Sequence, residues 1–172
     1  MTQPHSQSSA LTHVTTGATG SESRMVDVGE KAASARRALA RARVRMPAGT
    51  LRGVLAGAGP KGAVTEVARV AGILAAKRTA EWIPMCHTLA LDGVRIEFLE
   101  CAGDVLEIRC EARCMGRTGV EMEAMVGASA AALTVYDMTK ALGHGIAIEQ
   151  VELLEKDGGK SGPWRREPLR GA

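Results

Sequence analysis

The chain has 172 residues, of which 45% are apolar and 24% are charged, so it fits one compact globular domain. Its formal charge of +3 is small and only four residues are aromatic, which argues against a nucleic-acid-binding protein. No apolar run reaches the roughly 18 residues that cross a membrane, and the polar N-terminus lacks the apolar core of a secretory signal. We therefore expect a cytoplasmic protein.

Both ends of the chain are predicted to be flexible tails. Residues 1–24 are rich in Ser, Thr, Gly and Gln, and residues 163–172 carry three arginines. Residues 25–162 contain no internal repeat and no linker, and we expect them to form a single α+β domain.

The first predicted element is a strand. Within the stretch RRALARARVRM at 36–46, residues 40–46 alternate strictly between apolar residues and arginines. A period of two is typical of a half-buried strand, here with Ala40, Ala42, Val44 and Met46 facing inward.

Two helical segments are expected next. Pro47 opens a short one that ends near Leu55, and a longer helix runs from about residue 63 to residue 77. One side of the longer helix carries apolar residues at amphipathic spacing, namely Val64, Val67, Ala68, Ala71 and Leu74 or Ala75.

The remaining elements complete the fold prediction. Alternating runs at 94–98 and 106–114 indicate an antiparallel hairpin, followed by a helix at about 119–142 and a strand at about 146–154. This order favours an α+β, ferredoxin-like fold: a mostly antiparallel four-stranded sheet with helices packed on one face.

Two glycine-rich stretches resemble nucleotide-binding loops. The stretch GAGPKG at 57–62 matches G-x-G-x-x-G, but the segment before it reads as helix, which disfavours a dinucleotide site. Amides at the following helix start, beside Lys61, could still cradle an anion. The stretch GGKSG at 158–162 lacks the first glycine of a P-loop, and we expect a flexible loop that carries Lys156 and Lys160.

The cysteines and histidines give a weaker signal. The four cysteines form no C-x-x-C pair, so we expect buried reduced thiols and no metal site. His87 lies in an apolar stretch and is either a hydrogen-bonded fixture or a general acid or base. Its neighbour Cys86 points to the opposite side of an extended chain, which disfavours a Cys–His nucleophile.

An acidic pair begins the long second helix. Glu121 and Glu123 place negative charge where a helix N-terminus favours it, or they are catalytic carboxylates. Positions two apart cannot both face one pocket from a regular helix, so an irregular turn at Gly119 or a single contacting glutamate is expected. The stretch VGASAAAL at 126–133 is so low in bulk that another backbone must pack close to it.

Further along this helix, Asp137 and Lys140 stand at i and i+3 and can form an ion pair. Fourteen residues separate Glu123 from Asp137, a rise of about 21 Å. The two acids therefore cannot reach one small reacting centre within a single chain. Either the substrate is long, or a second subunit brings its own Glu123 toward Asp137.

Five stretches together carry a family resemblance: MVDVGEK at 25–31, KGAVTEVARVAGILAAKRT at 61–79, IPMCHTLAL at 83–91, TGVEMEAMVGASAAALTVYDMTKAL at 118–142 and LLEKDGGKSG at 153–162. They closely resemble the molybdenum cofactor biosynthesis protein C family, the cyclic pyranopterin monophosphate synthases.

The resemblance implies a ferredoxin-like subunit in a homohexamer, a trimer of dimers with active sites at the dimer interface. It implies conversion of 3′,8-cyclo-7,8-dihydro-GTP to cyclic pyranopterin monophosphate with release of pyrophosphate. No metal and no organic cofactor is implied. The upstream radical GTP cyclase, which makes this substrate, is a candidate partner.

The resemblance also implies site residues. The catalytic ones are Lys61, His87, Asp137 and Lys140, and the substrate-binding ones are Met85, Cys86, His87, Glu121, Met122, Glu123, Arg36 and Lys156. As a working hypothesis, Asp137 and Lys140 transfer protons and a glutamate recognises the guanine. His87, Lys61, Lys156 and Arg36 contact the phosphates.

The chain departs from the family pattern at two notable positions. Thr88 stands where a proline usually follows the histidine, and Ala63 where an aspartate commonly follows the KG pair. We expect these two departures to affect the rate of the reaction and not its identity. Two other readings stay open: a non-catalytic oligomeric module that binds an anionic nucleotide or pterin, and a Rossmann-like oxidoreductase.

Overall fold

A computed structural model describes residues 14–17, 20–57 and 59–167 of the chain, and it is an α+β fold. Its elements are β1 (Val14–Gly17), β2 (Gly20–Ser23), β3 (Ser34–Arg45), α1 (Leu51–Leu55), α2 (Val64–Lys77), α3 (Thr79–Trp82), β4 (Gly93–Cys101), β5 (Val105–Gly116), α4 (Glu121–Thr139), the 3-10 turn η1 (Lys140–Leu142), β6 (Ala147–Asp157) and β7 (Trp164–Arg165).

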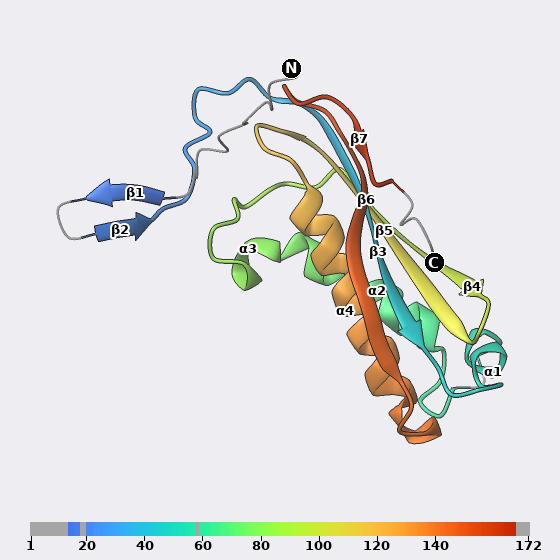
Figure 1. Ribbon diagram of the computed structural model, residues 1–172. Coiled ribbons are helices and arrows are strands. Elements are labelled where there is room, and N and C mark those ends of the chain that lie inside the picture. Colours follow the sequence, from blue (N-terminus) through green and yellow to red (C-terminus); the bar gives the residue numbers. More distant parts are fainter. Residues whose placement is uncertain (1–13, 18–19, 58, 168–172) are drawn as a thin grey trace, which may run out of the picture.

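The main sheet is antiparallel and has the order β4-β5-β3-β6-β7, with α2 and α4 on one face (Figure 1). The predicted ferredoxin-like arrangement is confirmed, with a short fifth strand added to the four expected. None of the helices in the described part of the chain is long and apolar enough to cross a membrane.

The alternation in β3 predicted its inner face correctly. Ala40, Ala42 and Val44 are fully buried, and Met46 is 3% exposed. On the neighbouring strand β5, Ile108 pairs with Ala42 and is also fully buried. Burial of these aliphatic side chains under α2 and α4 makes one continuous core.

The predicted close approach to the small-residue stretch of α4 is also found, and its partner is α2. A Cβ added at Gly127 would lie 2.6 Å from Cys110 Sγ and 3.2 Å from Gly72 O. A Cβ added at Gly72 would lie 2.8 Å from Gly127 O. The two glycines therefore let the helix backbones touch, and larger residues would force them apart.

Gly127→Ala is expected to lower the free energy of unfolding by about 1–3 kcal/mol, because the core cannot absorb a methyl group there without strain. Gly53→Ala in α1 is the matched control, since a Cβ there meets nothing within 4 Å. Urea denaturation of both variants measures the difference. Equal stabilities would contradict the close-packing account.

The buried face of α2 matches the predicted amphipathic stripe only in part: Val64, Ala68 and Ala75 are buried as expected, but Val67 and Leu74 are not. Val67 and Leu74 are each 48% exposed, and Val70 is 56% exposed. Apart from Val64, the core-facing positions are small, and Ala76, which was not predicted, is fully buried together with Ala68. Contact with α4 at backbone distance selects small residues, so the bulky side chains turn outward.

The structure places regular strands inside both predicted tails. β1 and β2 pair antiparallel within residues 1–24, and β7 pairs with β6 within residues 163–172. Residues 1–13, 18–19 and 168–172 of those tails lie outside the described residues.

The outer face of the sheet carries a lattice of ion pairs. Arg41 Nε donates to Glu152 Oε1 at 2.7 Å, and Arg41 also pairs with Glu107 at 3.4 Å. The arginines cover both acids so well that Glu107 is 4% and Glu152 8% exposed. This face is therefore bound together by charge-assisted hydrogen bonds rather than by apolar contact.

Candidate functional site

Six of the predicted site residues line one cavity of about 350 Å³ at the N-terminal end of α4. The stretch after α3 and the first turn of α4 supply them, as Met85, Cys86, His87, Glu121, Met122 and Glu123. We refer to this cavity as the acidic cavity.

Both glutamates reach this cavity, although they stand two positions apart. Val120 has non-helical dihedrals, φ −115° and ψ 24°, so α4 begins at Glu121. Because the cavity lies at the helix end rather than along one side, Glu121 and Glu123 can both line it. The sequence predicted an irregular turn at Gly119 or a single contacting glutamate; the cavity's position at the helix end lets both glutamates line it.

Glu123 is 4% exposed, and burial raises its pKa to about 7, with a smaller contribution from the negative charge of Glu121. A carboxyl with this pKa is present in both protonation states near neutral pH. It can therefore donate a hydrogen bond to a ligand or take up a proton from one.

This raised pKa predicts a pH-dependent stability. The ordinary pKa is 4.5, so the folded protein binds a proton more tightly than the unfolded chain, and this stabilisation is lost as pH rises through about 7. Glu123→Gln stays neutral at every pH, so its stability advantage over wild type should grow by about 2 kcal/mol between pH 5 and pH 8. Urea unfolding at the two pH values measures it. An unchanged difference would contradict the assignment.

His87 is held by a backbone contact. Its Nε2 lies 2.8 Å from the carbonyl oxygen of Val26, so Nε2 carries a proton and donates it. This hydrogen bond orients the ring and leaves Nδ1 as the atom that can exchange a proton. The fixture and the acid–base interpretations of His87 are therefore compatible.

Cys86 does not have the features of a nucleophile. Burial, followed by the negative charge of Glu123, raises the pKa of its thiol. A thiol with a raised pKa holds little thiolate at neutral pH. Cys86 therefore lines the acidic cavity as a neutral side chain.

A second, larger cavity of about 890 Å³ adjoins the acidic one, and the two share Lys31, Thr118, Gly119 and Glu121. Three acids and six cations line it, the cations being Lys31, Arg36, Arg37, Arg117, Lys156 and Lys160. We refer to it as the basic cavity. Of these six cations, only Arg36 and Lys156 were predicted as site residues.

Four further cations of the basic cavity were not predicted as site residues, namely Lys31, Arg37, Arg117 and Lys160. Lys31 and Lys160 fall inside stretches that carry the family resemblance, and Arg117 directly precedes the turn into α4. For Lys31 and Lys160, the position within these stretches was the sequence signal that could have identified them. Glu121 links the two cavities, because its carboxylate lies 3.2 Å from Lys156 Nζ.

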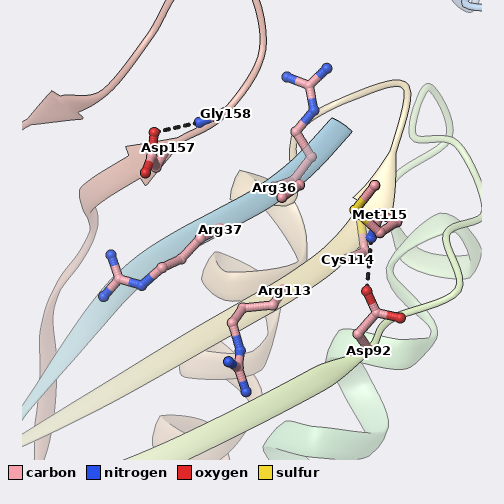
Figure 2. Close-up of a pocket in the computed structure, with 9 residues that line it drawn as sticks. Arg36, Arg37, Asp92, Arg113, Cys114, Met115, Asp157 and Gly158 are labelled. Carbon is pink, nitrogen blue, oxygen red and sulfur yellow. Dashed lines mark hydrogen bonds between the residues drawn. The ribbon is translucent and has the colours of Figure 1, made fainter. Parts of the chain in front are cut away.

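Arg36 is oriented by backbone carbonyls at the end of β5. Its Nε donates to Gly116 O at 3.2 Å, and its Nη2 donates to Arg117 O at 3.5 Å. A neighbouring cavity of about 560 Å³ also includes Arg37 and Arg113, but Figure 2 shows these three arginines pointing in different directions. The three guanidinium groups of this cavity diverge, and that of Arg37 is paired with Glu111 and Glu155. We therefore count neither this cavity nor Arg37 toward an anion site, and the case for the basic cavity rests on its other cations.

The other predicted residues form a separate cluster at the far end of α4. Asp137 accepts hydrogen bonds from Lys140 Nζ at 2.7 Å and from Lys61 Nζ at 2.8 Å. Lys140 and then Lys61 lower the pKa of Asp137 to about 2, and Asp137 raises the pKa of Lys140. The predicted Asp137–Lys140 pair is confirmed, and Lys61 joins it.

Within one chain this cluster does not meet the two cavities. α4 separates Asp137 from Glu123 by a rise of about 21 Å. The three side chains of the cluster are about half exposed, from 48% for Lys61 to 57% for Asp137 and Lys140. Among the residues that the structure describes, no group of three His, Cys, Asp or Glu could hold a metal ion.

Comparison with known proteins gives consistent matches. The MoaC family model matches residues 25–159. Relatives named cyclic pyranopterin monophosphate synthase include one from Chloroflexus aggregans, 54% identical over 84% of this chain and 88% of its own. Others come from Chloroflexus aurantiacus, 51% identical over 96% and 99%, and Novosphingobium aromaticivorans, 52% identical over 90% and 96%. Because the family model matches most of the chain and the relatives align over most of their own length, the chain belongs to the MoaC family.

Proposed function

We propose that the chain is a cyclic pyranopterin monophosphate synthase, a phosphorus–oxygen lyase of molybdenum cofactor biosynthesis. It converts 3′,8-cyclo-7,8-dihydro-GTP to cyclic pyranopterin monophosphate and pyrophosphate. The observation that carries the proposal is the junction of an acidic cavity, with Glu121, Glu123 and His87, and a cavity lined by six cations. Relatives that are at least 51% identical carry this enzyme's name.

The basic cavity suits the triphosphate of this substrate. A triphosphate carries about four negative charges, which Arg and Lys side chains bind through charge-assisted hydrogen bonds. In the reaction a substrate oxygen attacks the α-phosphorus, the bond to the bridging oxygen breaks, and pyrophosphate leaves with the bonding electrons. Arg36, Lys156 and their neighbours stabilise the charge that develops on the leaving group.

The acidic cavity suits the ring chemistry. Opening the purine and closing the pterin moves protons at several atoms, and one acid cannot reach them all. Glu123, with its pKa near 7, both donates and accepts, and His87 exchanges a proton at Nδ1. Because His87 lies beside the glutamates, we assign it to the ring rather than to the phosphates.

The cluster of Lys61, Asp137 and Lys140 can reach the substrate only when it comes from a second copy of the chain. Residue 130 lies midway between Glu123 and Asp137 on α4, so a two-fold axis there sets each copy's Asp137 opposite the other copy's Glu123. The exposed apolar side chains of this layer support such a contact, since they would otherwise face water; they are Val67, Val70, Leu74, Trp82, Leu133 and Tyr136.

In this dimer Lys61, Asp137 and Lys140 of one copy complete the cavities of the other. Three such dimers form the homohexamer. The carboxylate of Asp137 accepts a hydrogen bond from each ammonium group, which holds both in place, and it raises the pKa of Lys140. The two lysines act as acids and as charge stabilisers at the reacting atoms.

The direct test supplies purified protein with 3′,8-cyclo-7,8-dihydro-GTP and measures pterin product and pyrophosphate. Turnover yielding both in equal amounts is the expected result. Tight binding of the intermediate without product would identify a non-catalytic binding module instead. Saturable binding of a nicotinamide cofactor, which we expect to be absent, would indicate an oxidoreductase.

A further inference from the structure

The C-terminal segment closes a hairpin around the loop that carries Lys160. β7 pairs with β6 through Glu155 with Arg165 and Lys156 with Trp164. The intervening loop and Lys156 itself line the basic cavity. The position of these two lysines therefore depends on whether the short strand stays in place.

Arg166 supplies the contacts that hold the short strand. Its backbone N–H donates to Leu154 O at 2.8 Å, and its Nε donates to Leu153 O at 2.7 Å. The same guanidinium pairs with the buried Glu152 at 3.1 Å and stacks on Trp164, 5.8 Å from the ring centroid. A two-residue strand is too short to persist by its backbone alone, so these side-chain contacts fix it.

The loop in turn rests directly on the strand that bears Arg36. Gly158 and Gly159 have φ values of +96° and +79°, which favour glycine. A Cβ added at Gly158 would lie 2.1 Å from Ala35 O, and one at Gly159 would lie 1.8 Å from Arg36 Nη1. A shift of the loop would therefore also disturb Arg36.

From these contacts we infer that residues 164–166 form a C-terminal clip that orders the phosphate-binding loop. The clip touches no substrate; it positions Lys156, Lys160 and Arg36 before the triphosphate arrives. Without it, binding has to order the two lysine side chains, which weakens affinity. The inference rests on the proposed function of the basic cavity. It concerns residues 164–166 of the predicted C-terminal tail, and residues 168–172 lie outside the described residues.

The test measures binding of inorganic tripolyphosphate to the full-length protein by calorimetry. Arg166→Ala is expected to weaken binding about tenfold, as two lysines must be immobilised. Arg165→Ala is the matched control with an expected change under about twofold, because its side chain is 80% exposed and lies 3.5 Å from Glu155. In turnover assays Arg166→Ala should raise KM for the cyclised GTP while kcat stays near wild type.

Cleavage by lysyl endopeptidase after Lys160 gives a second readout that needs no ligand. Arg166→Ala should be cut faster than wild type and Arg165→Ala should not, with thermal melting confirming that each variant is folded. Equal tripolyphosphate affinity and equal cleavage in all three proteins would overturn the clip. Failure of wild type to bind tripolyphosphate would instead overturn the phosphate role of the basic cavity, and the clip with it.

Discussion

Asp137→Ala is expected to lower kcat by about 10³-fold, the range found when a group that sets general acid–base catalysis is lost. Asp137 accepts from Lys61 and Lys140 at 2.8 and 2.7 Å, so its removal leaves two ammonium groups repelling one another. The pKa of Lys140, which Asp137 raises, should then fall. Steady-state kinetics on the cyclised GTP measures the loss.

The pH profile separates this role from a general loss of charge. The pKa of Asp137 is about 2, so its carboxylate stays ionised throughout the working range. Because the pKa of Glu123 is about 7, kcat should change with pH near pH 7 in wild type. This change should be absent in Glu123→Gln. The control for Asp137→Ala is Glu66→Ala, which removes another exposed i,i+3 acid, 3.3 Å from Arg69. Equal kinetic losses in both variants would contradict a specific role for Asp137.

Arg41→Ala is expected to be the most destabilising change on the outer face of the sheet, by about 2–3 kcal/mol. Glu152 and Glu107 are nearly buried beneath its guanidinium and would lose a partner. Each keeps one other arginine, at 3.1 Å for Glu152 and 2.7 Å for Glu107, which limits the cost.

The control for Arg41→Ala lies on the edge strand of the same sheet. Arg95 pairs with Glu97, but its side chain is 72% exposed, so Arg95→Ala should cost less than about 1 kcal/mol. Urea unfolding of both variants makes the comparison. If the two variants lose the same amount, the partly buried ion pairs do not stabilise the sheet as described.

The sheet could be predicted because its strands are long and half buried. Twelve residues of β3 give enough alternation to identify an inner face, and every inner residue named from the sequence is buried. β7 could not be predicted in this way, because two residues show no period. Its pairing depends on Arg166 contacting β6, a tertiary interaction that leaves no local pattern.

The sequence could indicate candidate site residues, but it could not indicate how they are arranged in space. Helix geometry alone separated Glu123 from Asp137, and the structure keeps them on different turns of α4. The spacing could not reveal that Lys61 joins Asp137, since the two residues are 76 positions apart in sequence. Nor could it assign the outward side of α2, where Val67 and Leu74 sit opposite the glycine contact with α4.

The central claim is that each site combines Glu123 of one copy with Asp137 of another, and subunit mixing tests it most directly. Asp137→Ala and Glu123→Ala proteins, each inactive alone, are unfolded together, refolded and assayed on the cyclised GTP. Random pairing makes half of the dimers mixed, and each mixed dimer holds one undamaged site. About one quarter of wild-type activity should therefore return. A mixture as inactive as its components would contradict sites shared between subunits.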